Sequence, residues 1–209
     1  MPNTTAAEAA NNNALGAEWL WSRRLPITKD SPPWRYLREQ RRYTGKIPAT
    51  LGYLPARGEH SDAMIAAFGL APEAEPGALA PPRMVAGIHL TRLTQDGQKA
   101  PNAEGKAKIM LGCCKGAPIV LAPPNDLVGL AITEGIEDAI SVSQATGLAV
   151  WAAGAANFMP ALADLVPNYI EVITIYAHAD PEGQRHARAL AEKLKVRRDL
   201  EVRVTGTAP

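Results

Sequence analysis

The second half of the chain alternates between short apolar runs and segments with helical periodicity. The apolar runs predict β-strands at 130–133, 149–152, 171–177 and 201–205. A helix is predicted at 136–145, a short helix after the second strand, and a last helix that carries a core-facing stripe from Ala187 to Leu194. Strands that alternate with helices favour right-handed crossovers. Residues 126–209 are therefore predicted to form an α/β core, with a parallel four-stranded sheet flanked by helices.

Residues 83–125 have the period-2 pattern of strands instead. The segment 85–93 alternates apolar and polar residues, and Asp96–Gly97 is a turn signal. Apolar runs at 108–113 and 118–122 predict two further strands. This stretch is therefore predicted to be a small β-rich, antiparallel segment that precedes the α/β core.

Residues 17–82 are predicted to be a helical N-terminal segment followed by a Pro-rich linker. Helical patterns cover 17–42, and Pro32 and Pro33 fit a helix start there because proline is tolerated in the first turn. A short helix is predicted at 60–69. Four prolines and one glycine in 71–82 indicate the linker. Residues 1–16, rich in Ala, Asn and Thr, are predicted to be disordered.

Composition is ordinary for a globular protein, with 46% hydrophobic and 21% charged residues among 209. The formal net charge of +1 provides no global basic field, so any nucleic-acid surface has to be local. Cys113 and Cys114 are adjacent and lack a zinc-site spacing, which favours reduced thiols in a cytoplasmic protein. No apolar run approaches the ~18 residues of a membrane helix, and no signal-peptide pattern is present, so no membrane partner is expected.

Acidic residues follow two of the predicted strands. Glu134 comes directly after 130–133, and Asp180 and Glu182 lie just past 171–177. Open α/β sheets build ligand sites at the carboxyl ends of their strands. Two unit charges ~4 Å apart at an effective dielectric of ~20 repel by roughly 4 kcal/mol, which a shared cation would relieve. Since Mg²⁺ takes carboxylates together with waters and phosphates, the pattern predicts a divalent-metal site that handles phosphates.

The acidic residues also have structural explanations. Asp180, Pro181 and Glu182 make a good helix start, with an N-cap, a proline in the first position and an acid in the first turn. Asp138 would complement the dipole of the helix predicted at 136–145. Glu134 is harder to explain in this way, because glutamate is a poor strand residue and no cap is needed from it.

ITEGIEDAI (132–140) and YAHADPEG (176–183) resemble the two hallmark motifs of the Toprim domain. This metal-binding fold occurs in bacterial-type primases, type I and II topoisomerases and some nucleases. Its hallmarks are a glutamate-glycine pair after the first strand and a D-x-D motif after the third. The resemblance extends over 17–205 to the primase-like proteins of phages and plasmids, and is strongest from Met84 on.

The resemblance implies roles for single residues. Glu134 matches the glutamate proposed as acid/base or metal ligand, and Asp180 matches the second aspartate of D-x-D. Glu182 stands where topoisomerases have a third acid. The expected catalytic residues are Glu134 and Asp180, the expected metal ligands are Glu134, His178, Asp180 and Glu182, and the supporting residues are Gly135, Asp138 and Gly183.

His178 departs from the family pattern, because it occupies the position of the first aspartate. Imidazole suits Mn²⁺ or Zn²⁺ better than Mg²⁺ and carries no negative charge. A weakened metal site, a shift toward Mn²⁺, and loss of catalysis with the fold retained all stay open. We expect a weakened site for Mg²⁺ or Mn²⁺ that Glu182 compensates in part.

The resemblance implies metal-dependent nucleotidyl transfer on single-stranded DNA in replication priming, with nucleoside triphosphates as substrates. A Toprim nuclease and a catalytically silent module that binds nucleic acid or a replisome are the alternatives. The basic residues expected to contact nucleic acid are Lys99, Lys106, Lys108 and Arg92.

Such proteins usually carry a zinc-binding domain and often a helicase. The sequence lacks ligands for that zinc module. An excised fragment, a protein that works with a separate helicase or zinc-binding protein, and a relic all remain open.

Overall fold

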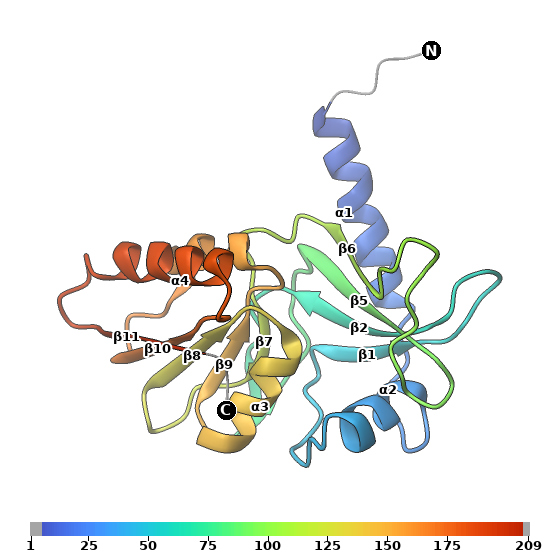
Figure 1. The fold of residues 1–209 in the computed structure, drawn as a ribbon, viewed down its shortest axis with the longest axis horizontal. Helices are drawn as coiled ribbons and strands as arrows, with labels where there is room; N and C mark the ends of the chain where they lie inside the picture. Colours follow the sequence, from blue (N-terminus) through green and yellow to red (C-terminus); the bar gives the residue numbers. More distant parts are fainter. Residues whose placement is uncertain (1–5, 207–209) are drawn as a thin grey trace. The chain divides into compact units, whose positions relative to one another are not determined.

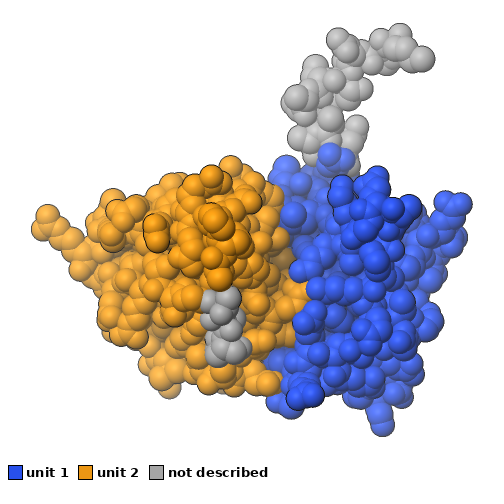
Figure 2. Space-filling view, viewed as in Figure 1, with its two compact units in different colours: residues 1–69, 82–114 blue, residues 70–81, 115–209 orange. Residues whose placement is uncertain are grey.

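The computed structural model describes residues 6–206, which fall into two compact units. Unit 1 comprises residues 1–69 and 82–114, and unit 2 comprises residues 70–81 and 115–209 (Figure 2). Among the described residues, every helix is too short or too polar to cross a membrane.

Unit 1 is built on an antiparallel sheet with the order β1-β2-β5-β6 (Figure 1). Its strands are β1 (Leu51–Leu54), β2 (Asp62–Phe68), β5 (Gly87–Leu93) and β6 (Lys108–Gly112). Helix α1 (Ala6–Ser22) buries Ala17 and Trp21 against Ile65, Ala67 and Ile88 of this sheet. Helix α2 (Pro32–Arg35) continues into the π-helical turn η1 (Tyr36–Gln40).

The helix predicted at 60–69 is wrong, because this segment forms strand β2. All seven residues of β2 are buried, and the strand pairs with β1 on one side and β5 on the other. A strand covered on both faces has a continuous apolar run, which periodicity alone does not distinguish from a short buried helix. Of the stretch 1–16 that was expected to be disordered, residues 6–16 lie in α1, and residues 1–5 lie outside the described part.

Unit 2 contains a five-stranded, mostly parallel sheet with the order β11-β10-β8-β9-β7. Its strands are β7 (Ile119–Ala122), β8 (Gly129–Thr133), β9 (Ala149–Ala152), β10 (Val172–Tyr176) and β11 (Glu201–Thr205). Its helices are α3 (Ile136–Thr146), the 3₁₀ helix η2 (Ala156–Leu165) and α4 (Pro181–Leu194). The predicted linker forms a small hairpin of β3 (Glu73–Glu75) and β4 (Ala78–Leu79). The α/β class is confirmed.

The prediction of four strands in this sheet needs one correction. Strand β7, expected in the antiparallel segment 83–125, pairs antiparallel with β9 at the edge of the unit 2 sheet. Its first three residues are buried. A short apolar run predicts a strand but carries no signal for the sheet that it joins, so this assignment required the structure.

The strand order positions the acidic connections. Strands β8 and β10 are parallel neighbours, with Thr133 opposite Tyr176. Glu134 follows the last residue of β8, and the connection to His178 follows the last residue of the neighbouring strand β10, at the same edge of the sheet. Both connections lie at the carboxyl edge of the sheet, which is the edge at which open α/β sheets carry their sites.

We predict that Ile175→Ala in β10 destabilises the protein by about 2–5 kcal/mol, because it leaves a cavity in the core of unit 2. Ile175 is fully buried in that core. Val204→Ala in β11, a position 42% exposed, is the control and should cost well under half as much. Urea denaturation followed by circular dichroism measures both changes. Equal losses of unfolding free energy in the two variants would contradict the placement of Ile175 in the core.

Candidate functional site

His178 lies among three carboxylates at the carboxyl edge of the unit 2 sheet. Its Nε2 is 2.8 Å from Asp138 Oδ2, and its Nδ1 is 3.2 Å from Glu134 Oε2. Asp180 Oδ2 lies 4.0 Å from the same Nδ1. Both ring nitrogens thus face carboxylate oxygens, which only accept hydrogen bonds when ionised. The Nε2 atom is hydrogen-bonded to Asp138, and carboxylate charge beside both ring nitrogens stabilises the protonated form of the ring over the neutral one.

The turn after β8 sets the position of Glu134. Gly154, beyond β9, donates its N–H to the carbonyl oxygen of Glu134 at 2.8 Å. The buried Thr133 donates from Oγ1 to the carbonyl oxygen of Gly135 at 2.9 Å. A side chain at Gly135 would place its Cβ 3.3 Å from Asp138 Oδ2. The glycine therefore leaves room for the aspartate of the first turn of α3 to reach His178.

The first turn of α4 holds the backbone of His178. Asp180 caps this helix, since its Oδ1 accepts a hydrogen bond from Gly183 N at 2.8 Å. Gln184 Nε2 donates to the carbonyl oxygen of His178 at 3.0 Å. A Cβ on Gly183 would lie 2.9 Å from His178 Cβ and 3.1 Å from its carbonyl oxygen, so glycine permits this close approach. Gln184 was missed from the sequence, where no motif marks it.

The surrounding charges shift two pKa values. The hydrogen bond with Asp138 is the main cause that raises the pKa of His178, and the charges of Glu134, Asp138 and Asp180 raise it further against the opposing effect of burial. The pKa of Asp180 is lowered, chiefly by the hydrogen bond from Gly183 N–H and also by the charge of His178. Both shifts favour the charged pair over the neutral one.

Glu182 does not join this group through its carboxylate. Its side chain is 65% exposed on α4, with Oε1 3.8 Å from His186 Nε2. The structure therefore brings together Glu134, Asp138, His178 and Asp180, which the sequence had named. The side chain of Glu182, the fourth acidic candidate, points away from them.

The four basic candidates lie in unit 1. Lys106 precedes β6 and forms an exposed ion pair, 3.2 Å long, with the glutamate two residues earlier. Lys108 pairs with Thr91, so it lies on the opposite face of the sheet from Arg92, the next residue along β5. Lys99 forms a β-bridge with Leu93. Strand alternation thus separates Arg92 from Lys108, and these side chains do not form a single surface.

A divalent cation does not fit the arrangement around His178. Within the described residues, no group of three or more His, Cys, Asp or Glu side chains is arranged to hold a metal ion. The ring of His178 lies between Glu134 and Asp138 and contacts both. A protonated ring at this point would supply the positive charge that a shared cation would otherwise supply.

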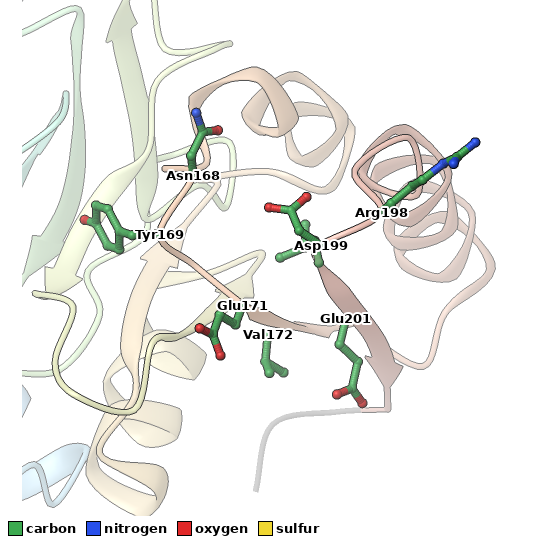
Figure 3. A pocket seen from close by; sticks show the side chains of 8 residues that line it. Asn168, Tyr169, Glu171, Val172, Arg198, Asp199 and Glu201 are labelled. Carbon is green, nitrogen blue, oxygen red and sulfur yellow. The ribbon is translucent and has the colours of Figure 1, made fainter.

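The cavity in Figure 3 lies at the other end of the same sheet. It has a volume of about 600 Å³ and is lined by Glu171, Asp199 and Glu201 among others. Val172 and Glu201 are the first residues of β10 and β11, whereas His178 follows the last residue of β10. This cavity is therefore separate from the candidate site.

Comparison with known proteins identifies the unit that carries the site. Residues 129–205 match the family of Toprim domains. This match confirms the Toprim resemblance of the two motifs, and it covers β8 to β11 with the helices between them. Toprim domains generally bind divalent metal ions. No curated protein matches the sequence.

Solved structures of primases have a similar fold. The E. coli primase catalytic core aligns with a TM-score of 0.50 at 9% identity, covering 97% of this chain and 72% of that one. The DnaG catalytic core aligns at 0.48 and 11%, with the same coverage. A DNA primase domain from Pseudomonas aeruginosa aligns at 0.47 and 10%, covering 76% of this chain and 48% of that one. At these identities the likeness concerns the fold alone, and this chain spans about half of the Pseudomonas domain.

We predict that Asp138→Asn lowers the pKa of His178, because the hydrogen bond with this carboxylate is the main cause of its upward shift. NMR titration of the His178 ring protons measures the change. Asp164→Asn, which removes an exposed carboxylate of η2, is the control and should leave the pKa unchanged. If both variants changed the pKa of His178 equally, the contact between His178 and Asp138 would be contradicted.

The same shift has a consequence for stability. Since the folded pKa lies above the ordinary value of 6.5, His178 stabilises the fold fully below that pH. This contribution is lost as the pH rises through the folded pKa, and partial exposure of the ring keeps it small. Asp138→Asn should therefore flatten the decline in stability above pH 6.5.

Proposed function

We propose that this chain is a primase-like Toprim protein, of the kind found in phages and plasmids, that joins nucleotides on single-stranded DNA in replication priming. The observation that carries the proposal is the convergence of Glu134, Asp138 and Asp180 on one point at the carboxyl edge of a sheet that matches the Toprim family. Ligand sites of parallel sheets lie at this edge. The primase-like fold is consistent with DNA and nucleotides as partners.

In this proposal Glu134 is the general base. Its side chain is 26% exposed, so it is not sealed from solvent or substrate. A positioned carboxylate that takes a proton from an attacking hydroxyl contributes about 10²–10⁴-fold to a rate. Asp180 has its Oδ1 engaged by the first turn of α4 and is 55% exposed, so it is the second proposed catalytic residue. We assign no step to a metal ion, because the residues as arranged do not accommodate one.

His178 supports a second candidate, a module that binds nucleic acid without catalysis. The ring balances the charge of Glu134 and Asp138 from within the chain. A site that carries its own counter-ion needs no bound metal to remain folded. The fold and the acidic cluster would then persist after nucleotidyl transfer had been lost.

We predict that the protein makes labelled primers from nucleoside triphosphates on single-stranded DNA, assayed in Mg²⁺ and in Mn²⁺. Glu134→Gln should lower the yield by roughly 100-fold or more, because the proposed base is removed without a change in shape. Glu192→Gln, which neutralises an exposed glutamate paired with Lys195 on α4, is the matched control and should keep the yield.

Each product of this assay has one meaning. Short labelled RNA that depends on Glu134 supports the primase proposal. A shortened template supports a Toprim nuclease instead. Template binding without either product supports the silent module.

We predict that His178→Asp binds Mg²⁺ roughly tenfold or more tightly than the wild type in a calorimetric titration. The substitution removes the ring that occupies Glu134 and Asp138, and it adds a hard oxygen ligand beside them. His178→Asn is the control, since it removes the ring without adding a carboxylate. If the wild type bound Mg²⁺ as tightly as His178→Asp does, the interpretation that the ring takes the place of a cation would be contradicted.

A further inference from the structure

Unit 1 contains a groove with a volume of about 980 Å³ that the proposed function does not use. Trp19 and Leu20 of α1, with Arg23 just after that helix, form one wall, and residues 55–61, which follow β1, form the other. Between the walls lies one face of the β1-β2-β5-β6 sheet. The groove thus belongs to unit 1 alone.

The floor of the groove is aliphatic. Cross-strand pairing places Leu54 opposite Ala63 and Leu90 opposite Ile109, and alternation puts these residues on the face that α1 covers. Helix α1 covers only part of this face, through Ala17 and Trp21. Leu54, Leu90, Ile109 and Leu111 remain half-buried beside it. These side chains lie beside α1 and line the open groove next to it.

The rim of the groove is cationic. Arg23 after α1 and Arg57 after β1 are exposed, and Arg92 lies at the edge of the floor. Glu59 is the only acidic residue among the lining residues of the groove. In the part of the chain that the structure describes, none of the three guanidinium groups forms an ion pair. An occupant with negative charge on both sides of an apolar surface would complement this rim.

We propose that this groove binds an amphipathic helix of a partner protein, with aliphatic side chains on one face and aspartate or glutamate on its flanks. Helix-in-groove recognition uses an apolar stripe at helical spacing on an apolar floor. The floor presents side chains and not the unpaired backbone of an edge strand, which excludes an added β-strand as the occupant of the floor. The arginines of the rim are positively charged, so the residues that flank the apolar stripe of the bound helix should be acidic.

The same residues argue against single-stranded nucleic acid in the groove. Sequence-tolerant binding of single strands relies on aromatic rings on which bases stack. The floor holds no aromatic side chain, and the rings among the lining residues of the walls are those of Trp19 and His60. The guanidinium of Arg23 lies over the ring of Trp19, 5.4 Å from the centroid. The ring is therefore already engaged by a cation on one face.

The test is a display selection with the full chain as bait and a library of random helical peptides. Selected peptides are then measured by fluorescence anisotropy against the wild type and against Arg23→Glu with Arg57→Glu. Two exposed arginines of α4, changed as Arg185→Glu with Arg188→Glu, form the matched control. Circular dichroism verifies that each variant is folded, and oligothymidylate serves as a competitor.

The proposal is supported if the enriched peptides have an aliphatic stripe and acidic flanks. Their affinity should fall roughly tenfold or more for the groove variant and stay unchanged for the control. Their affinity should fall with added salt. Peptides that are basic, or that bind the groove variant as tightly as the wild type, would overturn it. So would an empty selection, or displacement of the peptides by oligothymidylate.

Discussion

Three acidic side chains at the carboxyl edge of the unit 2 sheet share one neighbour, the ring of His178, whose pKa is raised by the hydrogen bond with Asp138 and by their charges. A pair of carboxylates ~4 Å apart costs roughly 4 kcal/mol at an effective dielectric of ~20, and this edge gathers three. His178 relieves that repulsion with both ring nitrogens, at 2.8 Å from Asp138 and 3.2 Å from Glu134. Toprim domains generally bind divalent metal ions, and in this chain the ring of His178 lies between two of the acids.

The backbone around the site is arranged for this contact. The parallel pairing of β8 with β10 brings their carboxyl ends to one edge, and the absence of a side chain at Gly135 and Gly183 lets the two helix starts approach His178. Gln184 then fixes the carbonyl group of the histidine. The position of the ring thus follows from several local constraints, which suits a group that must stay charged beside partly exposed acids.

The sequence predicts regular alternation well and side-chain direction poorly. Strands β8 to β11 and helices α3 and α4 were predictable because apolar runs and a helical stripe mark them. The position of Glu134 after a strand, together with the Toprim resemblance, suggested that Glu134 and His178 would meet. Strand β2 was not predictable, since a run buried on both faces lacks a period. Neither the outward turn of Glu182 nor the contact of Gln184 has a signal in spacing, because both depend on how α4 is rotated.

The central claim is that His178 is an imidazolium that occupies the position of a cation. The most direct measurement is the ¹⁵N chemical shift of both His178 ring nitrogens at neutral pH, recorded with and without excess Mg²⁺. The account predicts two protonated nitrogens whose shifts do not change when Mg²⁺ is added. A neutral ring, or a ring whose nitrogens respond to Mg²⁺ as the ion takes its place, would contradict it.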